Sequence, residues 1–208
     1  MNKKLLSFFI LFTFAFLLSS QAQTVTIGKQ VWMSENLNID KFRNGDLIPE
    51  AKTEEEWVKA GEKGKPAWCY YDNDPKNGEK YGKLYNWYAV NDPRGLAPKG
   101  WHIPSDDEWT ILTNFLGGAK VAGDKMKSKT EWKDGGNGSN SSGFLGLPGG
   151  SRANNGTFYN VGSGDYWWSS TEGSASSAWS RFLYYYNGKA NGYDFTKTNG
   201  FSVRCLRD

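Results

Sequence analysis

The chain has little histidine, little cysteine and almost no excess charge. Its 208 residues include one histidine, His102, and two cysteines, and 25 basic residues stand against 22 acidic ones. No C-x-x-C, H-E-x-x-H or glycine-rich nucleotide-binding pattern is present, which excludes the usual zinc and nucleotide sites. Because the charges are nearly balanced and interspersed, we expect no nucleic-acid partner and no anionic membrane partner.

Long apolar runs are also missing, except at the beginning of the chain. Leu5 to Leu18 is almost wholly apolar, follows Lys3 and Lys4, and precedes the small residues of Ser20-Gln21-Ala22. This pattern predicts a secretory signal peptide over residues 1–22, with a run too short for a typical membrane span. We therefore expect an exported protein, secreted, periplasmic or surface-associated, with one domain over residues 23–208 and no membrane span after cleavage.

The two cysteines, Cys69 and Cys205, favour a disulfide bond. Exported proteins fold in an oxidising environment, where paired cysteines are the usual outcome. Cys205 follows Phe201 and Val203 at strand alternation, so its side chain is expected to point inward. Two separate buried thiols are the alternative.

The segment KGWHIPSDDEW, from Lys99 to Trp109, predicts a capped helix. Ser105 and Glu108 form the S-x-x-E capping box, and the acidic residues between them favour the positive end of the helix dipole. His102 lies before this cap without any nucleophile motif, so we interpret it as structural rather than catalytic.

Other segments carry weaker signals. Residues 25–27 and 30–33 predict a hairpin around Gly28-Lys29. Residues 53–60 predict a helix that begins with a second capping box, Thr53 and Glu56, and that Gly61 ends. Residues 81–90 fit either a helix or a strand that runs into a helix. Residues 201–207 predict a final strand.

Aromatic residues and glycine are abundant, with 10 Trp, 11 Tyr and 25 Gly. Most of the rings must form the core, because few aliphatic residues follow Pro148. Strand alternation, however, cannot turn Trp167 and Trp168 to the same face. Some rings should therefore be exposed among polar loops, where they would suit a sugar or peptide. The candidate ligand contacts are Trp167, Trp168, Tyr185 and Arg152.

The polar segment from Asp72 to Glu79 has clustered oxygen ligands. Asp72 and Asp74 make calcium a candidate cofactor, although the spacing is not that of an EF-hand loop. A solvated turn is the alternative, since Asp and Asn are ordinary turn formers. The sequence predicts no other metal site and no catalytic residue.

Six ordered blocks carry a family resemblance: TVTIGKQVWMSENL, YGKLYNWYAV, GLAPKGWHIPSDDEW, GFLGLPGGSR, YWWSSTE and GFSVRCLRD. Together they resemble the Fibrobacter succinogenes major paralogous domain, over nearly the whole chain after residue 24. The resemblance implies an exported bacterial protein and assigns no particular activity.

The HIPSDDEW block is also similar to the R-L-P-T-E-x-E-W block of formylglycine-generating, sulfatase-modifying enzymes, whose fold is a variant of the C-type lectin fold. This resemblance implies an α+β, C-type lectin-like domain with two main helices, a small twisted antiparallel sheet that joins the termini, and long Gly/Ser/Asn-rich loops. Those oxidases use two closely spaced cysteines near the C-terminus, and only Cys205 lies there. The calcium-site signatures of C-type lectins are missing as well.

From these features we expect a secreted, non-enzymatic domain that binds a glycan or another extracellular or cell-surface polymer. A metal-dependent oxidase related to the sulfatase-modifying enzymes is one alternative, and it requires free cysteines close to a pocket. A structural surface or adhesion component is the other, and it requires flat surfaces without a concave aromatic site.

Overall fold

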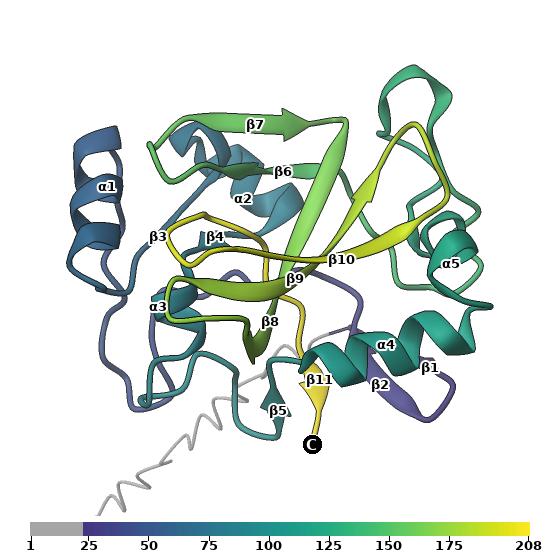
Figure 1. Ribbon diagram of the computed structural model, residues 1–208, viewed down its shortest axis with the longest axis horizontal. Helices are drawn as coiled ribbons and strands as arrows, with labels where there is room; N and C mark the ends of the chain where they lie inside the picture. Colours follow the sequence, from purple (N-terminus) through teal and green to yellow (C-terminus); the bar gives the residue numbers. More distant parts are fainter. Residues whose placement is uncertain (1–22) are drawn as a thin grey trace, which may run out of the picture.

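The computed structural model describes residues 23–208, so the predicted signal peptide lies outside the described residues. Within this range the fold is α+β, as expected (Figure 1). No helix in the described range is long and apolar enough to cross a membrane. The helices are α1 (Glu54–Glu62), α2 (Pro75–Tyr81), α3 (Trp87–Val90), α4 (Asp106–Phe115) and α5 (Ala119–Met126), with 3₁₀ turns at Tyr71–Asn73 and Lys133–Gly135.

A four-stranded antiparallel sheet joins the two ends of the described chain (Figure 1). The hairpin expected around Gly28 is present, and its second strand pairs with the C-terminal strand. This confirms the prediction of a small antiparallel sheet at the termini. The strand order is β1 (Thr24–Ile27), β2 (Gln30–Met33), β11 (Leu206–Arg207) and β5 (Trp101–His102).

A larger, five-stranded sheet forms the centre of the molecule. One pair, β6 and β8, is parallel, so this sheet is mixed rather than antiparallel. Its order is β10 (Ala190–Thr196), β9 (Ser177–Tyr184), β8 (Gly164–Glu172), β6 (Gly149–Arg152) and β7 (Phe158–Val161). A two-stranded ladder of β3 (Trp68–Cys69) and β4 (Leu84–Tyr85) completes the strands.

Both predicted capping boxes are present. In α4 the Ser105 hydroxyl accepts from the Glu108 amide at 3.2 Å, and Glu108 Oε2 accepts from the Ser105 amide at 2.8 Å. Thr53 and Glu56 make the same pair of bonds at the start of α1. Gly61, however, does not end α1. It lies in the last turn and faces Thr198, whose Cγ2 would be 2.8 Å from an added Cβ.

The polar segment after residue 71 contains a helix that the sequence did not indicate. Asp74 caps α2 by accepting from the Lys76 amide at 3.0 Å, and Pro75 occupies the first helical position, where its missing N–H costs nothing. Asp72 lies in the preceding 3₁₀ turn with φ +53°. No group of three or more acidic, histidine or cysteine residues gathers as a metal site among residues 23–208. Downstream, β4 runs into α3, the second of the two forms expected for residues 81–90.

The centre of the five-stranded sheet is covered on both faces. On one face Trp167 of β8 packs with Trp109 of α4 and with Phe144, at centroid distances of 6.3 and 5.4 Å. On the other face Tyr166 and Trp168 lie 4.9 and 4.4 Å from Phe201. Helices α4 and α5 lie together on the first face, against β8 to β10 (Figure 1). Strand β8 is therefore part of two aromatic cores at once.

The predicted disulfide between Cys69 and Cys205 is wrong, because both residues are free thiols. Each is fully buried, but in a different hydrophobic cluster. Burial raises the pKa of each thiol to about 12. Both cysteines therefore behave as small core residues, as in the alternative interpretation.

Candidate functional site

Trp167 and Trp168 do not form a binding surface, so the prediction that they contact a ligand is wrong. Both side chains are 0% exposed. Trp167 Nε1 donates to Asn36 Oδ1 at 2.8 Å, and Trp168 Nε1 donates to the Tyr85 carbonyl at 2.8 Å. Alternation does place the two rings on opposite faces, but the central strand has protein against both faces.

Arg152 is also buried, which makes its prediction as a ligand contact wrong. Its side chain is 0% exposed. Its Nε donates to the Gly156 carbonyl at 2.8 Å, and its two terminal nitrogens donate to the carbonyls of Ala51 and Thr53 at 2.8 and 2.9 Å. The guanidinium lies over the Trp57 ring, 4.9 Å from its centroid. Arg152 therefore ties the start of α1 to the sheet.

Tyr185 is the one predicted ligand contact that keeps exposed surface. It is partly buried against the core beside α4 and α5. Its ring is nearly perpendicular to that of Tyr186, at 5.3 Å. The neighbouring residues, rather than Tyr185 itself, form the main aromatic surface.

An aromatic row runs along β9 and β10 and consists of Tyr193, Phe195, Phe182, Tyr184 and Tyr186. In this order the successive ring centroids are 5.3, 5.9, 5.4 and 5.2 Å apart. The two end residues are well exposed, Tyr193 at 59% and Tyr186 at 65%. The three central rings are partly buried and pack against the core. The row is therefore a contiguous set of rings that is exposed at both ends.

Strand register explains why these rings gather. Tyr193 and Phe195 are two residues apart on β10, so they share a face, and their partners on β9 are the small residues Ser180 and Ala178. Such small partners leave the rings uncovered. Tyr186 follows the end of β9 and stacks on Tyr184 with an interplanar angle of 16°.

Polar groups accompany the row. The Tyr184 hydroxyl lies 2.6 Å from the Tyr166 hydroxyl, which also accepts from Asn160 Nδ2 at 2.8 Å. Burial raises the pKa of Tyr166, so its phenol stays protonated. These groups place hydrogen-bonding capacity beside the central rings.

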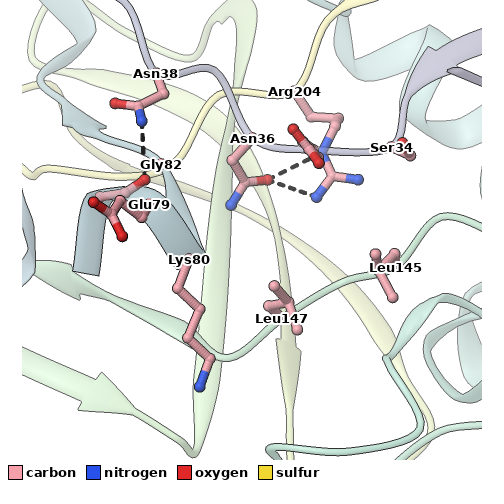
Figure 2. A pocket seen from close by; sticks show the side chains of 11 residues that line it. Ser34, Asn36, Asn38, Glu79, Lys80, Gly82, Leu145, Leu147 and Arg204 are labelled. Carbon is pink, nitrogen blue, oxygen red and sulfur yellow. Dashed lines mark hydrogen bonds between the residues drawn. The ribbon is translucent and has the colours of Figure 1, made fainter. Parts of the chain in front are cut away.

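A separate polar pocket lies between the segment after β2, helix α2 and the loop around Leu145 (Figure 2). Its volume is about 130 Å³. Figure 2 shows Asn38 bonded to the Gly78 carbonyl and the Arg204 guanidinium bonded to Asn36 Oδ1. The polar side chains at the back of the pocket are therefore bonded to the protein itself.

Asn36 connects two buried ionisable residues, Asp165 and Arg204, behind this pocket. Its Oδ1 accepts from Arg204 Nε and Nη2 at 3.0 and 2.7 Å, and its Nδ2 lies 3.4 Å from Asp165 Oδ2. Burial raises the pKa of Asp165 to about 8. The hydrogen bonds that its carboxyl group accepts from the Tyr166 amide and the Ser202 hydroxyl lower the pKa, but by less than burial raises it. Burial lowers the pKa of Arg204 to about 10. This network joins β8 to the C-terminal segment and has a structural role.

Only the rim of the pocket offers free polar groups. Glu35 and Glu79 line it, and Lys80 is paired with Glu131. A volume of this size admits a small polar group, and it excludes a polymer segment. The pocket is therefore a weaker candidate for polymer binding than the aromatic row.

His102 holds β5 to the start of α4. Its Nε2 lies 2.9 Å from Glu108 Oε1, and its Nδ1 lies 2.9 Å from Asp208 Oδ1. Burial lowers the pKa of His102, but the hydrogen bonds to Asp208 and Glu108 outweigh this effect and raise it above 6.5. Glu108 uses its other carboxylate oxygen in the capping box. These contacts hold the imidazole between the start of α4 and Asp208.

Comparisons with known proteins identify the family. The Fibrobacter succinogenes major domain matches residues 25–207. Neither curated proteins nor solved structures gave a match. Since the family match covers nearly all of the described chain, this protein belongs to the Fibrobacter succinogenes major domain family.

Proposed function

We propose that this protein is an exported, non-enzymatic binding domain that recognises a glycan or a similar extracellular polymer through the aromatic row. The observation that carries the proposal is the contiguity of the five rings, with two exposed tyrosines at the ends. A sugar ring has an apolar C–H face that packs on an aromatic ring, and hydroxyls that bond to neighbouring phenols.

The arrangement of the rings favours an extended ligand. Tyr184 and Tyr186 are nearly parallel, whereas the rings of Phe182 and Phe195 are inclined by 80°. The surface is therefore ridged, and a chain that crosses it meets faces and edges in turn. A polymer that contacts several rings gains binding free energy from each contact, so it does not need one deep pocket.

Three further features support the proposal. The segment 1–22 reads as a signal peptide, the charges are nearly balanced, which disfavours nucleic acid as the partner, and the blocks shared with the sulfatase-modifying enzymes suggest a C-type lectin-like fold. The fold argument is an analogy, because one fold serves many functions.

The oxidase alternative gains no support from the cysteines. Cys69 and Cys205 are free, as that alternative requires, but neither lines the polar pocket of Figure 2. Their raised pKa values keep both thiols protonated, whereas a reactive or metal-bound cysteine is a thiolate. An adhesion component is the second candidate, because the row is an open ridge rather than a concave site.

A glycan array combined with affinity electrophoresis tests the proposal. We expect the wild-type protein to bind at least one polysaccharide, and the double variant Tyr186→Ala, Tyr193→Ala to bind it at least about tenfold more weakly. Tyr159→Ala is the matched control, because Tyr159 is 48% exposed but lies on β7, away from the row. Absence of binding, or equal binding by the double variant, would rule out this function for the row.

A further inference from the structure

A second cleft lies on the opposite face of the sheet, between α4, the start of α5 and the start of β10. It has a volume of about 480 Å³ and contains the side chains of Arg181, Lys120, Lys189 and Asp106. Three cations thus face one carboxylate. Both lysines are exposed, and neither takes part in the ion pairs of residues 23–208.

Arg181 is buried in the wall of this cleft without a full set of partners. The residue is 8% exposed. Its Nη2 donates to Thr110 Oγ1 at 2.7 Å and to the Asp106 carbonyl at 3.3 Å, but its Nε has no partner. Asp106 Oδ1 lies 3.0 Å from Nη2 and is not aligned for a hydrogen bond. Arg152 and Arg204, by contrast, donate from all three nitrogens. A buried guanidinium with unused donors calls for an explanation.

The N-terminus of α5 opens into the same cleft. Gly118 is the N-cap and provides no side-chain hydrogen bond. The amides of Ala119 and Lys120 donate to no backbone oxygen of the described chain, whereas the next two amides donate to Gly118. Free amides at a helix N-terminus, where the helix dipole is positive, attract anions.

We propose that this cleft binds an oxyanion, a carboxylate or sulfate group such as an acidic polysaccharide carries. The Arg181 guanidinium and the free α5 amides approach the cleft from two different elements, and the lysines add long-range attraction. The proposal is independent of the aromatic row, which lies on the other face of the sheet.

Gly192 allows a test that leaves the charge unchanged. It lies directly opposite Arg181 in the β9–β10 register, and an added Cβ would be 1.5 Å from Arg181 Nη1. Gly192→Ala should therefore displace the guanidinium. Since the obstructed atom is the end of a flexible side chain, the fold should persist.

The experiment measures binding of sodium sulfate, glucuronate and glucose to the full protein by calorimetry, with sodium chloride at matched ionic strength. We expect saturable binding of sulfate, glucuronate or both, and none of glucose. Gly192→Ala should weaken the binding at least about tenfold. Binding of sulfate alone would identify a tetrahedral anion as the preferred ligand. Binding of glucuronate would identify the carboxylate of a sugar acid.

A second variant covers the case in which Gly192→Ala does not fold. Lys120→Ala with Lys189→Ala removes two exposed charges, and Lys59→Ala with Lys63→Ala on and after α1 is the matched control. We expect about tenfold weaker binding for the first pair and no change for the second. No saturable anion binding, or equal binding by a folded Gly192→Ala or by the cleft lysine pair, would overturn the proposal. Unchanged sulfate binding by the Tyr186/Tyr193 variant would separate this cleft from the aromatic row.

Discussion

Strands β8 and β10 belong to the same sheet and are both rich in aromatic residues, but they differ in what covers them. Strand β8 is central, and its first six residues are all buried. Strand β10 is an edge strand, with one buried residue among seven. The ring of Trp168 consequently stabilises the core, whereas the ring of Tyr193 is accessible to a ligand. Availability for binding depends on the position of a strand in the sheet rather than on its ring content.

The largest expected effect is the pH dependence of stability that Asp165 causes in the interior of β8. Its pKa of about 8, against 3.8 for an ordinary aspartate, means that the folded protein keeps a proton that the unfolded chain has lost. The stability contribution is therefore full below about pH 3.8 and is lost as the pH rises through 8. We expect a fall in unfolding free energy on the order of 5 kcal/mol over this range, measured by denaturant titration.

Asp165→Asn should remove most of this pH dependence. The amide cannot ionise, and its oxygen can still accept from the Tyr166 amide and Ser202. Asp134→Asn, at an exposed position, is the control and should keep the wild-type profile. The same steep profile in Asp165→Asn would show that another group titrates.

Trp168→Ala tests the core side of the comparison directly. Removal of a fully buried indole and of its bond to the Tyr85 carbonyl should cost about 3–5 kcal/mol of stability. Equilibrium unfolding in urea measures the loss. A variant of wild-type stability that had lost glycan binding would contradict a purely structural role for this ring.

Tyr186→Ala tests the surface side in the same assay. This ring is 65% exposed and stacks only on neighbouring tyrosines, so its removal should cost about 1 kcal/mol or less. Its effect should appear in binding instead. A loss as large as that of Trp168→Ala would mean that the aromatic row belongs to the core.

The sequence predicted those features that depend on neighbouring residues. The capping boxes at Thr53 and Ser105 and the hairpin at Gly28 follow from local hydrogen bonding, and all three are present. The exception is α2, where the same Asp74 that starts a helix also fits a turn. Local patterns fail when two structures share one signal.

Features that depend on distant partners were not predictable in the same way. Alternation separates Trp167 from Trp168, but it does not reveal that α4 covers one face and Phe201 the other. The disulfide failed for the same reason, since the distance between Cys69 and Cys205 is set by the whole fold. Phe182 and Tyr184 are two residues apart on β9 and carried the alternation signal of the aromatic row. Their exposure, however, depends on their partners across the sheet, Asn191 on β10 for Phe182 and Gly164 on β8 for Tyr184.

His102 should give the smallest effect, and it is the surface counterpart of Asp165. The carboxylates of Glu108 and Asp208 raise its pKa above 6.5 despite partial burial. The stabilisation is therefore full below pH 6.5 and is lost as the pH rises through the higher folded value. Because the imidazole is 37% exposed, solvent screening limits the effect to less than about 1 kcal/mol.

Since the chain has one histidine, a single imidazole NMR titration measures the pKa of His102 without assignment. His102→Gln in the Asp165→Asn background should remove the part of the remaining pH dependence of stability that lies above pH 6.5. A measured pKa at or below 6.5 would show that the two carboxylate contacts do not outweigh burial, and β5 would then be held to α4 by packing and uncharged hydrogen bonds.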